Sequence, residues 1–361
     1  MKIAFLFDDS LELGGTQRVI NSLANYFATY YDYEVELINF YRKSDKRHFE
    51  YDSKVKITYL DIFLKYKNFL LKYKEKLRSL KILKEYLKEQ KYDIIIGMSA
   101  RFNIYLVKVK KRLDSKLIGT EHIFYDGHSL KTKLRKKIYY NKLDILSVLT
   151  DYDYEKYSKF LNNVVKIHNP IPDAFKFKKY NKNSKKILAA GRLTKQKGFD
   201  MLLKAMPTVI KKCPDWKLEI FGQGEEKEEL QNLIDTLKLN DNVEIMDYVE
   251  NFYEITDNYS FYVMSSRYEA FPCVLIETQA KGLPAVSFDC LTGPGEIINN
   301  EKDGLLVETE NIEKLSAAIT RMIENDNMRI EMSGKAVKNS ERFLIKKICS
   351  EWNELFKKLE N

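Results

Sequence analysis

Two glutamates, Glu269 and Glu277, carry the strongest chemical signal in this 361-residue sequence. An apolar run at residues 260–264 predicts a strand before Glu269, and residues 272–281 predict a helix that contains Glu277. The loop between strand and helix therefore ends at a helix N-terminus, where unpaired N–H groups and the helix dipole favour a phosphate group. Two carboxylates beside that point can accept hydrogen bonds from sugar hydroxyls. The segment predicts a site for a sugar diphosphate, although the spacing alone also fits two solvated charges.

A glycine turn with two cations follows a second predicted strand, at residues 186–190. Gly191 makes the turn, and Arg192 and Lys197 follow it before the next helix. Arginine can grip an anionic diphosphate with a bidentate fork and lysine can neutralise it as a point charge. Gly222 opens another strand-to-helix turn, which is a weaker signal because tight turns need glycine for their own sake. The alternative interpretation is a basic turn on the surface.

The first half of the chain offers a third glycine turn. Gly15 opens the first predicted helix after a strand at residues 2–7, and Arg18 lies within that helix's first turn. Glycine lets the backbone approach a phosphate closely. The pattern departs from the GxGxxG dinucleotide fingerprint and disfavours a dehydrogenase. Asp8 and Asp9 lie at the end of that first strand and not in a metal-binding loop.

These residues need a scaffold, and the chain alternates short apolar runs with longer helical patterns, which is typical of α/β parallel sheets. Strands are predicted at residues 2–7, 33–40, 54–60, 92–97, 116–121, 145–149, 164–168, 186–190, 216–221, 243–246, 260–264, 284–288 and 304–307. Helices are predicted at residues 15–29, 62–90, 101–112, 130–142, 151–161, 198–212, 224–238, 272–281, 294–299 and 311–325, and throughout about 328–360.

The pattern lapses around residues 168–173 and in the polar run 178–184, which indicates a linker between two domains. We therefore predict an N-terminal domain at 1–170 and a C-terminal domain at 171–340. The last helical stretch, 341–361, adds no strand and is expected to pack back on the first domain.

The charge is uneven, which suggests an anionic partner for the first half. Residues 1–170 hold 33 Lys and Arg against 21 Asp and Glu, and the remainder holds 28 against 31, which together give the net +9. We find no membrane-spanning run and no secretory signal. Four scattered cysteines fit a reducing cytosol and argue against structural zinc.

In chain order these segments resemble the retaining glycosyltransferases of family 4, with the GT-B fold. The matching residues are Gly14, Gly15, Arg18, Thr120, Glu121, His122, Asn169, Pro170, Gly191, Arg192, Lys197, Gly198, Gly222, Gln223, Gly224, Glu269 and Glu277. The combination is specific although each piece is short. The resemblance implies two Rossmann-like domains facing a cleft, a C-terminal helix that crosses back to the first domain, and a nucleotide-sugar donor on the second.

The resemblance also implies roles for the residues of the second domain. Arg192 and Lys197 would stabilise the β-phosphate as the glycosidic bond breaks. Glu269 would bind donor-sugar hydroxyls and Glu277 the ribose. The residues that would surround the donor diphosphate are Gly191, Gly222, Phe271, Cys273 and Val274. Fixed cations and a helix end would replace a metal ion, so that the enzyme needs no cofactor.

In the first domain, the resemblance implies that Gly15 closes over the phosphates. His122 would face the reacting carbon or the acceptor, with Arg18 and Glu121 on the acceptor side. The departing phosphate oxygen would act as the base for the acceptor hydroxyl on the same face, so that configuration is retained.

Donor and acceptor are predicted less specifically. Residues 293–298 resemble a branch that uses UDP-hexose or UDP-N-acetylhexosamine donors in bacterial surface-polysaccharide assembly, with a GDP-mannose-dependent mannosyltransferase as the alternative. Residues 62–91 mix ten Lys and Arg with apolar residues, and the basic runs 108–112 and 131–137 extend the positive face. We predict peripheral binding to the anionic inner face of the cell membrane, beside a lipid-linked glycan acceptor. A solvated lysine-rich face remains the alternative.

Three other function classes stay open. A UDP-GlcNAc 2-epimerase-like enzyme shares the fold, but the glutamate pair and the basic turn disfavour it. An accessory GT-B-like subunit without activity is disfavoured by the complete set of charged residues. The charge alone fits nucleic-acid binding, but the sequence shows no recognisable binding module, and we predict no nucleic-acid partner.

Overall fold

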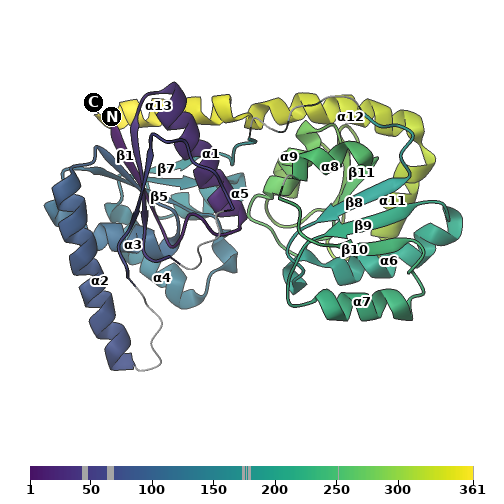
Figure 1. Ribbon diagram of the computed structural model, residues 1–361, viewed down its shortest axis with the longest axis horizontal. Coiled ribbons are helices and arrows are strands. Elements are labelled where there is room, and N and C mark those ends of the chain that lie inside the picture. Colours follow the sequence, from purple (N-terminus) through teal and green to yellow (C-terminus); the bar gives the residue numbers. More distant parts are fainter. Residues whose placement is uncertain are drawn as a thin grey trace. The chain divides into compact units, whose positions relative to one another are not determined.

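The computed structural model describes residues 1–42, 48–62, 69–172, 175, 177, 180–250 and 252–360, without the side chains of residues 69–72 and 112. The chain forms two compact units, Met1–Pro170 with Ile345–Asn361 and Ile171–Leu344 (Figure 1). Each is built around one parallel sheet, of seven and six strands. The predicted α/β class with two Rossmann-like domains is confirmed.

The first unit has the strand order β3-β2-β1-β4-β5-β6-β7, all parallel. Its strands are β1 (Lys2–Phe7), β2 (Glu34–Asn39), β3 (Val55–Tyr59), β4 (Ile94–Gly97), β5 (Lys116–Thr120), β6 (Ile145–Val148) and β7 (Val164–Lys166). Its helices are α1 (Gly15–Tyr30), α2 (Phe69–Gln90), α3 (Ala100–Val109), α4 (Leu130–Tyr139), α5 (Asp151–Ser158) and α13 (Ile345–Glu360). In Figure 1, α1 and α13 lie on one side of this sheet and α3 and α4 on the other.

The C-terminal helix α13 belongs to the first unit and packs on α1. The Phe356 ring lies 5.4 Å from that of Phe27, and the Tyr33 hydroxyl donates to Asn353. The apolar residues of α13 recur at helical spacing, and Ile345, Ile348 and Phe356 are buried. The predicted return of the chain's last helix to the first domain is therefore confirmed.

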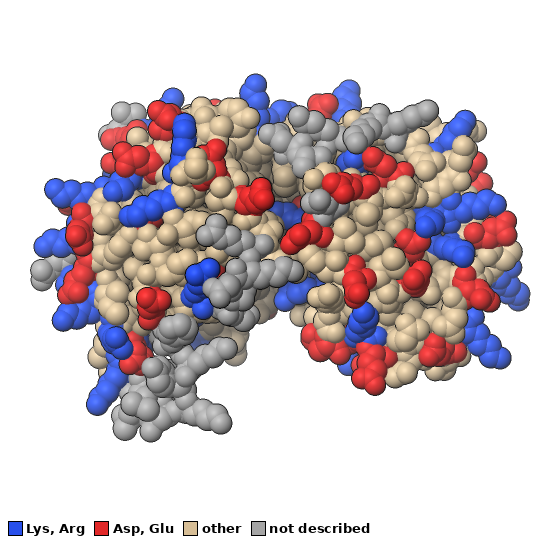
Figure 2. Space-filling view, in the orientation of Figure 1, with Lys and Arg blue, Asp and Glu red and all other residues tan. Residues whose placement is uncertain are grey.

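The second unit has the strand order β10-β9-β8-β11-β12-β13, again all parallel. Its strands are β8 (Lys186–Ala190), β9 (Lys217–Phe221), β10 (Val243–Met246), β11 (Phe261–Met264), β12 (Ala285–Phe288) and β13 (Gly304–Val307). Its helices are α6 (Phe199–Lys212), α7 (Lys227–Thr236), α8 (Phe252–Ile255), α9 (Cys273–Ala280), α10 (Pro294–Ile297), α11 (Ile312–Glu324) and α12 (Asp326–Ser340). Acidic and basic side chains are interspersed over its drawn face (Figure 2).

The elements follow the predicted pattern closely, with three exceptions. The short helix α8 was not predicted. The helix predicted at residues 62–90 is α2, and residues 63–68 of that prediction lie outside the described residues, as do 173, 178 and 179 of the predicted linker. The C-terminal helical stretch is divided into α12 and α13. Within the described residues, no helix is both long and apolar enough to cross a membrane.

Candidate functional site

The strand order fixes where a ligand can bind in the second unit. The chain leaves β8 in one direction, to β9, and later returns to the other side of β8 with β11. Ligands of open parallel sheets bind beside the carboxyl ends of the two strands at such a switch point. The loop after β8 carries Arg192 and Lys197, and the loop after β11 carries Glu269. The fold thus brings the two predicted loops to the same edge.

At that edge, Lys197 and Glu269 form an ion pair. The Nζ atom of Lys197 lies 2.6 Å from Oε1 of Glu269, and their side chains are only 18% and 8% exposed. The Ser266 hydroxyl donates to the same oxygen at 2.6 Å. The Thr292 hydroxyl donates to the backbone carbonyl of Glu269. Lys197 and Ser266 therefore hold one carboxylate oxygen, and Thr292 holds the backbone of the same residue.

Glycines hold the backbone of these loops together. The amide of Gly191 donates to the Phe221 carbonyl at 3.0 Å, and a Cβ on Gly222 would lie 1.9 Å from the Gly191 carbonyl oxygen. A Cβ on Gly191 would press on the side-chain stem of Lys197, at 3.1 to 3.3 Å. The predicted donor-binding glycines Gly191 and Gly222 thus support the position of Lys197 by close packing.

Arg192 follows β8 and Arg267 follows β11, but the two arginines have different contacts. The Arg267 guanidinium makes two 2.8 Å hydrogen bonds to the carboxylate of Asp200 and donates to the Lys195 carbonyl. Arg192 is exposed, and its side chain has no hydrogen bond or ion pair with any described residue. Arg192 is therefore a cation of this loop that is available to a ligand.

Helix α9 begins directly after the Glu269 loop. Pro272 precedes its first residue, Cys273, and the Pro272 carbonyl accepts the Leu275 amide at 3.1 Å. Cys273 and Val274, both half-buried, supply the first two N–H groups, which point away from the helix body as at every helix start. The buried ring of Phe271 packs against Phe343, with ring centres 5.5 Å apart, and so anchors the loop.

Glu277 shares its surroundings with Glu269. Its side chain is buried at 1% exposure. Burial and the negative charges of Glu269 and Glu277 raise the pKa of Tyr262, whose hydroxyl donates to the Ala190 carbonyl at 3.2 Å. Both predicted carboxylates therefore act on one buried tyrosine of β11, whose hydroxyl contacts the end of β8. Burial also raises the pKa of Cys290 to about 12, with Glu269 adding to the effect.

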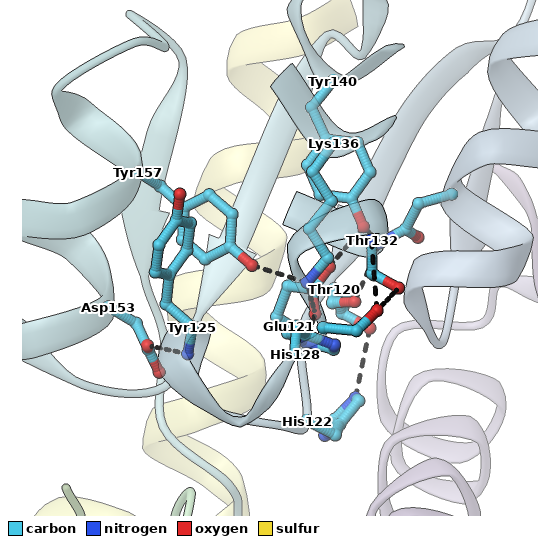
Figure 3. Close-up of polar contacts among 12 residues, drawn as sticks. Thr120, Glu121, His122, Tyr125, His128, Thr132, Lys136, Tyr140, Asp153 and Tyr157 are labelled. Atoms are coloured by element: carbon cyan, nitrogen blue, oxygen red, sulfur yellow. Dashed lines mark hydrogen bonds and ion pairs between the residues drawn. The ribbon is translucent and has the colours of Figure 1, made fainter. Parts of the chain in front are cut away.

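In the first unit, Glu121 and His122 follow β5, but their environments differ (Figure 3). The Glu121 carboxylate is buried and accepts hydrogen bonds from Lys136 Nζ at 2.8 Å and from the Tyr140 hydroxyl. His128 Nε2 lies 3.2 Å from the same carboxylate. Burial alone would raise the pKa of Glu121, but Lys136 and His128 outweigh it and hold that pKa at about 2. Glu121 is thus an internal anion.

Lys136 completes this network from α4. Its side chain is fully buried, and its Nζ also donates to the Tyr157 hydroxyl at 2.7 Å. Burial lowers the pKa of Lys136 and raises that of Tyr140 and Tyr157. The assignment of the whole run 131–137 to the positive surface was wrong at this position. Nothing in the sequence distinguishes Lys136 from the lysines around it, so Lys136, Tyr140 and Tyr157 were missed as partners of Glu121.

His122 is half-buried, and burial lowers its pKa to about 4. Its Nε2 lies 3.1 Å from the Thr120 hydroxyl, which donates to the Gly97 carbonyl at 2.9 Å. Since a hydroxyl has one proton, we infer that Nε2 is the donor to Thr120. The remaining nitrogen, Nδ1, then carries a lone pair in the neutral ring.

A small cavity lies at this edge of the first sheet. His122, Thr120, His168 and Asn169 line it together with Trp352 of α13, and about 20 Å³ of it can hold the centre of a water molecule. Gly15 opens α1, and a Cβ there would meet no heavy atom within 4 Å. Arg18 lies in the first turn of α1, with its amide bonded to the Gly14 carbonyl at 3.0 Å. Among the described residues, no group of three or more His, Cys, Asp or Glu could hold a metal ion.

Comparisons with known proteins decide the family. The family "Glycosyltransferase Family 4" matches residues 13–175, and "Glycosyl transferases group 1" matches residues 171–339. An uncharacterized glycosyltransferase of Haemophilus influenzae is 33% identical over 357 residues, which cover 97% of this chain and 98% of the relative. The chain belongs to the family 4 glycosyltransferases.

Two further full-length relatives of this glycosyltransferase have more specific names. The amylovoran biosynthesis glycosyltransferase AmsD of Erwinia amylovora is 29% identical, with 98% of this chain and 99% of the relative covered. A Campylobacter jejuni enzyme is 28% identical over 100% of this chain and 99% of its own length. Its name describes it as an α-1,4-N-acetyl-D-galactosaminyltransferase acting on a GalNAc-containing glycan linked to diphospho-undecaprenol.

Solved structures confirm the GT-B fold of the glycosyltransferase. Staphylococcus aureus TarM, solved with UDP, has a TM-score of 0.82 at 17% identity, with 99% of this chain and 100% of that chain covered. Anabaena HepE, solved with UDP, has a TM-score of 0.82 at 16% identity and the same coverage. These likenesses concern the fold alone.

Proposed function

We propose that this glycosyltransferase moves a hexose or N-acetylhexosamine, with retention of configuration, from a UDP-sugar to a lipid-linked glycan acceptor in bacterial surface-glycan biosynthesis. The observation that carries the proposal is the Lys197–Glu269 pair beside the N-terminus of α9, with Glu277 buried on that helix. It combines a cation, a helix start and two carboxylates, which are the groups that a sugar diphosphate requires.

In this proposal the second unit binds the donor. Arg192 and Lys197 face the β-phosphate. Arg192 is exposed, and its side chain has no hydrogen bond or ion pair with any described residue. The first N–H groups of α9, at Cys273 and Val274, bind the diphosphate from the other side, and Phe271 keeps that loop in place. Glu269 accepts hydrogen bonds from the transferred sugar. The contacts of Arg192, Lys197 and the helix start with the diphosphate strengthen as negative charge develops on the leaving phosphate. This lowers the barrier to bond breaking.

Glu277 and the two turn glycines would complete the donor site. Glu277 accepts hydrogen bonds from the ribose, and its burial fixes its orientation. Gly191 and Gly222 keep the turn narrow enough for the backbone to approach the nucleotide.

The first unit would supply the groups on the acceptor side. The open space over Gly15 admits a phosphate oxygen, and Arg18 adds a positive charge on the same turn of α1. The Nδ1 atom of His122 accepts a hydrogen bond from the hydroxyl of the glycan acceptor, or it faces the reacting carbon. Glu121 acts indirectly, because its contacts with Lys136 and Tyr140 fix the segment that carries His122.

The reaction would proceed by front-face transfer. The bond between the sugar C1 and the phosphate oxygen lengthens into an oxocarbenium-like state, and the acceptor oxygen bonds to C1 from the same side. The acceptor proton passes to the departing phosphate oxygen, and UDP leaves. Glu269 is tied to Lys197 and Ser266, which favours a hydrogen-bonding role over a nucleophilic one. Fixed cations and the helix end supply the charge that a metal ion would otherwise provide.

The donor and acceptor classes rest on the relatives and on residues 293–298. TarM and HepE have each been solved with UDP, and the Campylobacter jejuni relative acts on an undecaprenol-linked acceptor. An undecaprenol-linked acceptor would keep the enzyme in the cytoplasm at the inner face of the cell membrane, and the excess positive charge of residues 1–170 supports that location.

A calorimetric screen tests the donor. Purified protein is titrated with UDP-, GDP- and ADP-sugars, with EDTA present throughout. We expect a UDP-sugar to bind most tightly, and turnover with an undecaprenyl-diphosphate-linked glycan to give the α-anomer by NMR. Preferential binding of GDP-mannose would replace the donor assignment, and conversion of UDP-GlcNAc alone to ManNAc or UDP-ManNAc would favour an epimerase. If no sugar nucleotide binds, the proposal fails.

A further inference from the structure

Helix α4 exposes three large aliphatic side chains to solvent. Leu130, Leu134 and Ile138 are 85%, 61% and 53% exposed. Their spacing of four residues places them in one stripe along the helix surface. In an ordinary surface helix such a stripe faces the core and the polar residues face water, so the pattern of α4 is inverted.

The inner face of α4 fixes this orientation. Lys136 and the following Tyr140 are fully buried in the network around Glu121, and Ser129 caps the helix start by accepting the Thr132 amide. The stripe is therefore exposed by the way the helix is anchored. A rotation that buried it would bring the Lys136–Glu121 pair out of the interior.

Cations surround the stripe. Residues 130–139 contain five Lys and Arg and no Asp or Glu. Lys131 and Lys137 are exposed, whereas Lys133 is paired with Asp126 at 2.6 Å. Burial lowers the pKa of Lys76 on α2, and the charges of Lys108 on α3 and Arg135 on α4 lower it further. Three helices thus bring like charges together, which an anionic partner would relieve.

Helix α2, which contacts α3, also carries exposed apolar residues. Tyr73 and Leu77, one turn apart and next to Lys76, are 56% and 51% exposed. Further along α2, Leu83 and Leu87 are buried in the core of the first unit. The C-terminal half of this helix therefore serves packing, and its exposed apolar residues are near Lys76.

We propose that this surface, defined by Leu130, Leu134, Ile138 and the cations Lys76, Lys108, Lys131, Arg135 and Lys137, docks on an anionic lipid bilayer. The three aliphatic side chains enter the boundary between headgroups and acyl chains, and the cations pair with lipid phosphates, as in interfacial amphipathic helices. A second copy of the chain is a poorer occupant, because two identical acid-free helices would bring their cations face to face. The inference extends the proposed membrane location and does not depend on donor chemistry.

Flotation of the full chain with lipid vesicles tests this inference. We expect binding to phosphatidylglycerol–phosphatidylethanolamine vesicles, weakened by salt, and little binding to phosphatidylcholine alone. The triple variant Leu130→Ser, Leu134→Ser, Ile138→Ser should lose at least about tenfold in affinity for the anionic vesicles. Lys131→Glu with Lys137→Glu should also weaken binding. The matched control is Ile330→Ser on α12, an exposed aliphatic residue of the second unit, which should bind as the wild type does.

The outcomes separate this inference from the donor proposal. Calorimetric binding of a UDP-sugar should be the same in the triple variant and the wild type. If the wild type ignores anionic vesicles, or the triple variant binds them equally well, the docking surface is refuted while the donor site stands. If sedimentation shows a wild-type dimer that the triple variant disrupts, without a change in vesicle binding, a second copy occupies the stripe instead. Loss of nucleotide binding alone would refute the donor proposal and leave docking intact.

Discussion

Lys197 and Glu269, 72 residues apart in the chain, meet as an ion pair whose atoms are 2.6 Å apart. The cation assigned to the leaving phosphate is therefore held by the carboxylate assigned to the sugar. Removing one partner leaves the other charge poorly solvated, because both side chains are largely buried. The two residues act as one unit, and their effects on turnover should not be additive.

Lys197→Ala should lower kcat by about 10²–10³-fold, because it removes charge stabilisation that develops in the transition state. Lys195→Ala is the matched control, since Lys195 lies in the same turn but is exposed. Steady-state kinetics with circular dichroism on both variants provide the measurement. Equal kcat values for the two variants would remove Lys197 from the mechanism. In a double variant that combines Lys197→Ala with Glu269→Ala, the fold-loss in kcat should be smaller than the product of the losses in the two single variants.

Arg192→Ala should reduce turnover without lowering the unfolding midpoint, because the guanidinium has no described partner to lose. Arg267→Ala should do the opposite, since it breaks the paired hydrogen bonds to Asp200 and leaves that half-buried carboxylate with only the 4.0 Å ion pair to Lys204. Kinetics and thermal unfolding measured on both proteins distinguish a ligand-facing arginine from a structural one. A lower midpoint for Arg192→Ala would show that it supports the fold.

Two glycine substitutions should have contrasting effects. In Gly222→Ala the new Cβ would lie 1.9 Å from the Gly191 carbonyl oxygen, so we expect a loss of about 1–3 kcal/mol in unfolding free energy. Gly15→Ala meets open space and should leave unfolding unchanged. Its turnover should nevertheless fall if a donor phosphate occupies that space. Denaturant unfolding and kinetics together test this, and full activity in Gly15→Ala would contradict the assigned contact.

Lys136→Met should destabilise the first unit by about 3–5 kcal/mol, because it leaves the Glu121 carboxylate buried without its cation. Adding Glu121→Gln removes the stranded charge and should restore part of that loss. The two variants and the double variant form a cycle that can be measured by urea unfolding. An additive result would mean that the pair is not coupled.

The same network predicts a pH dependence of stability. The folded pKa of Glu121, about 2, lies below its ordinary value of 4.5. Its contribution to stability is therefore complete above pH 4.5 and is lost as the pH falls from there toward 2. Glu121→Gln should flatten this acid limb of the unfolding free energy. If the acid limb is unchanged in Glu121→Gln, the loss of stability at low pH comes from other carboxylates.

His122 should remain neutral through the physiological range. Its pKa of about 4 lies below the ordinary 6.5, so the folded chain resists its protonation and loses stability as the pH falls from 6.5 toward 4. An NMR titration of the ring should show no midpoint above pH 5, and His122→Ala should lower kcat. A midpoint near 6.5 would contradict the burial of the ring.

Much of the scaffold could be predicted from sequence because apolar runs and helical periodicity directly encode burial. The buried strands β8 and β11, for example, were predicted within one residue of their observed ends. Side-chain pairing could not be predicted in the same way. Lys197 and Glu269 were assigned to different parts of a ligand, and only the strand order brings them together.

Two further features depend on the orientation of a single helix. Apolar and basic residues occur on several faces of the helix over residues 130–139, so the sequence leaves open which face of α4 is buried. The buried face proved to be the one with Lys136, and the aliphatic stripe lies outside. Burial of a lysine runs against its usual preference, which is why a prediction by residue type fails there.

The two sides of α4 also limit how the protein can be engineered. Its three outer aliphatic residues are each more than half exposed, so serines in their place could yield a form that is easier to purify and crystallise. Transplanting the whole helix from another enzyme is a different matter, since the graft would have to bring a lysine at position 136 or leave Glu121 without its counter-ion.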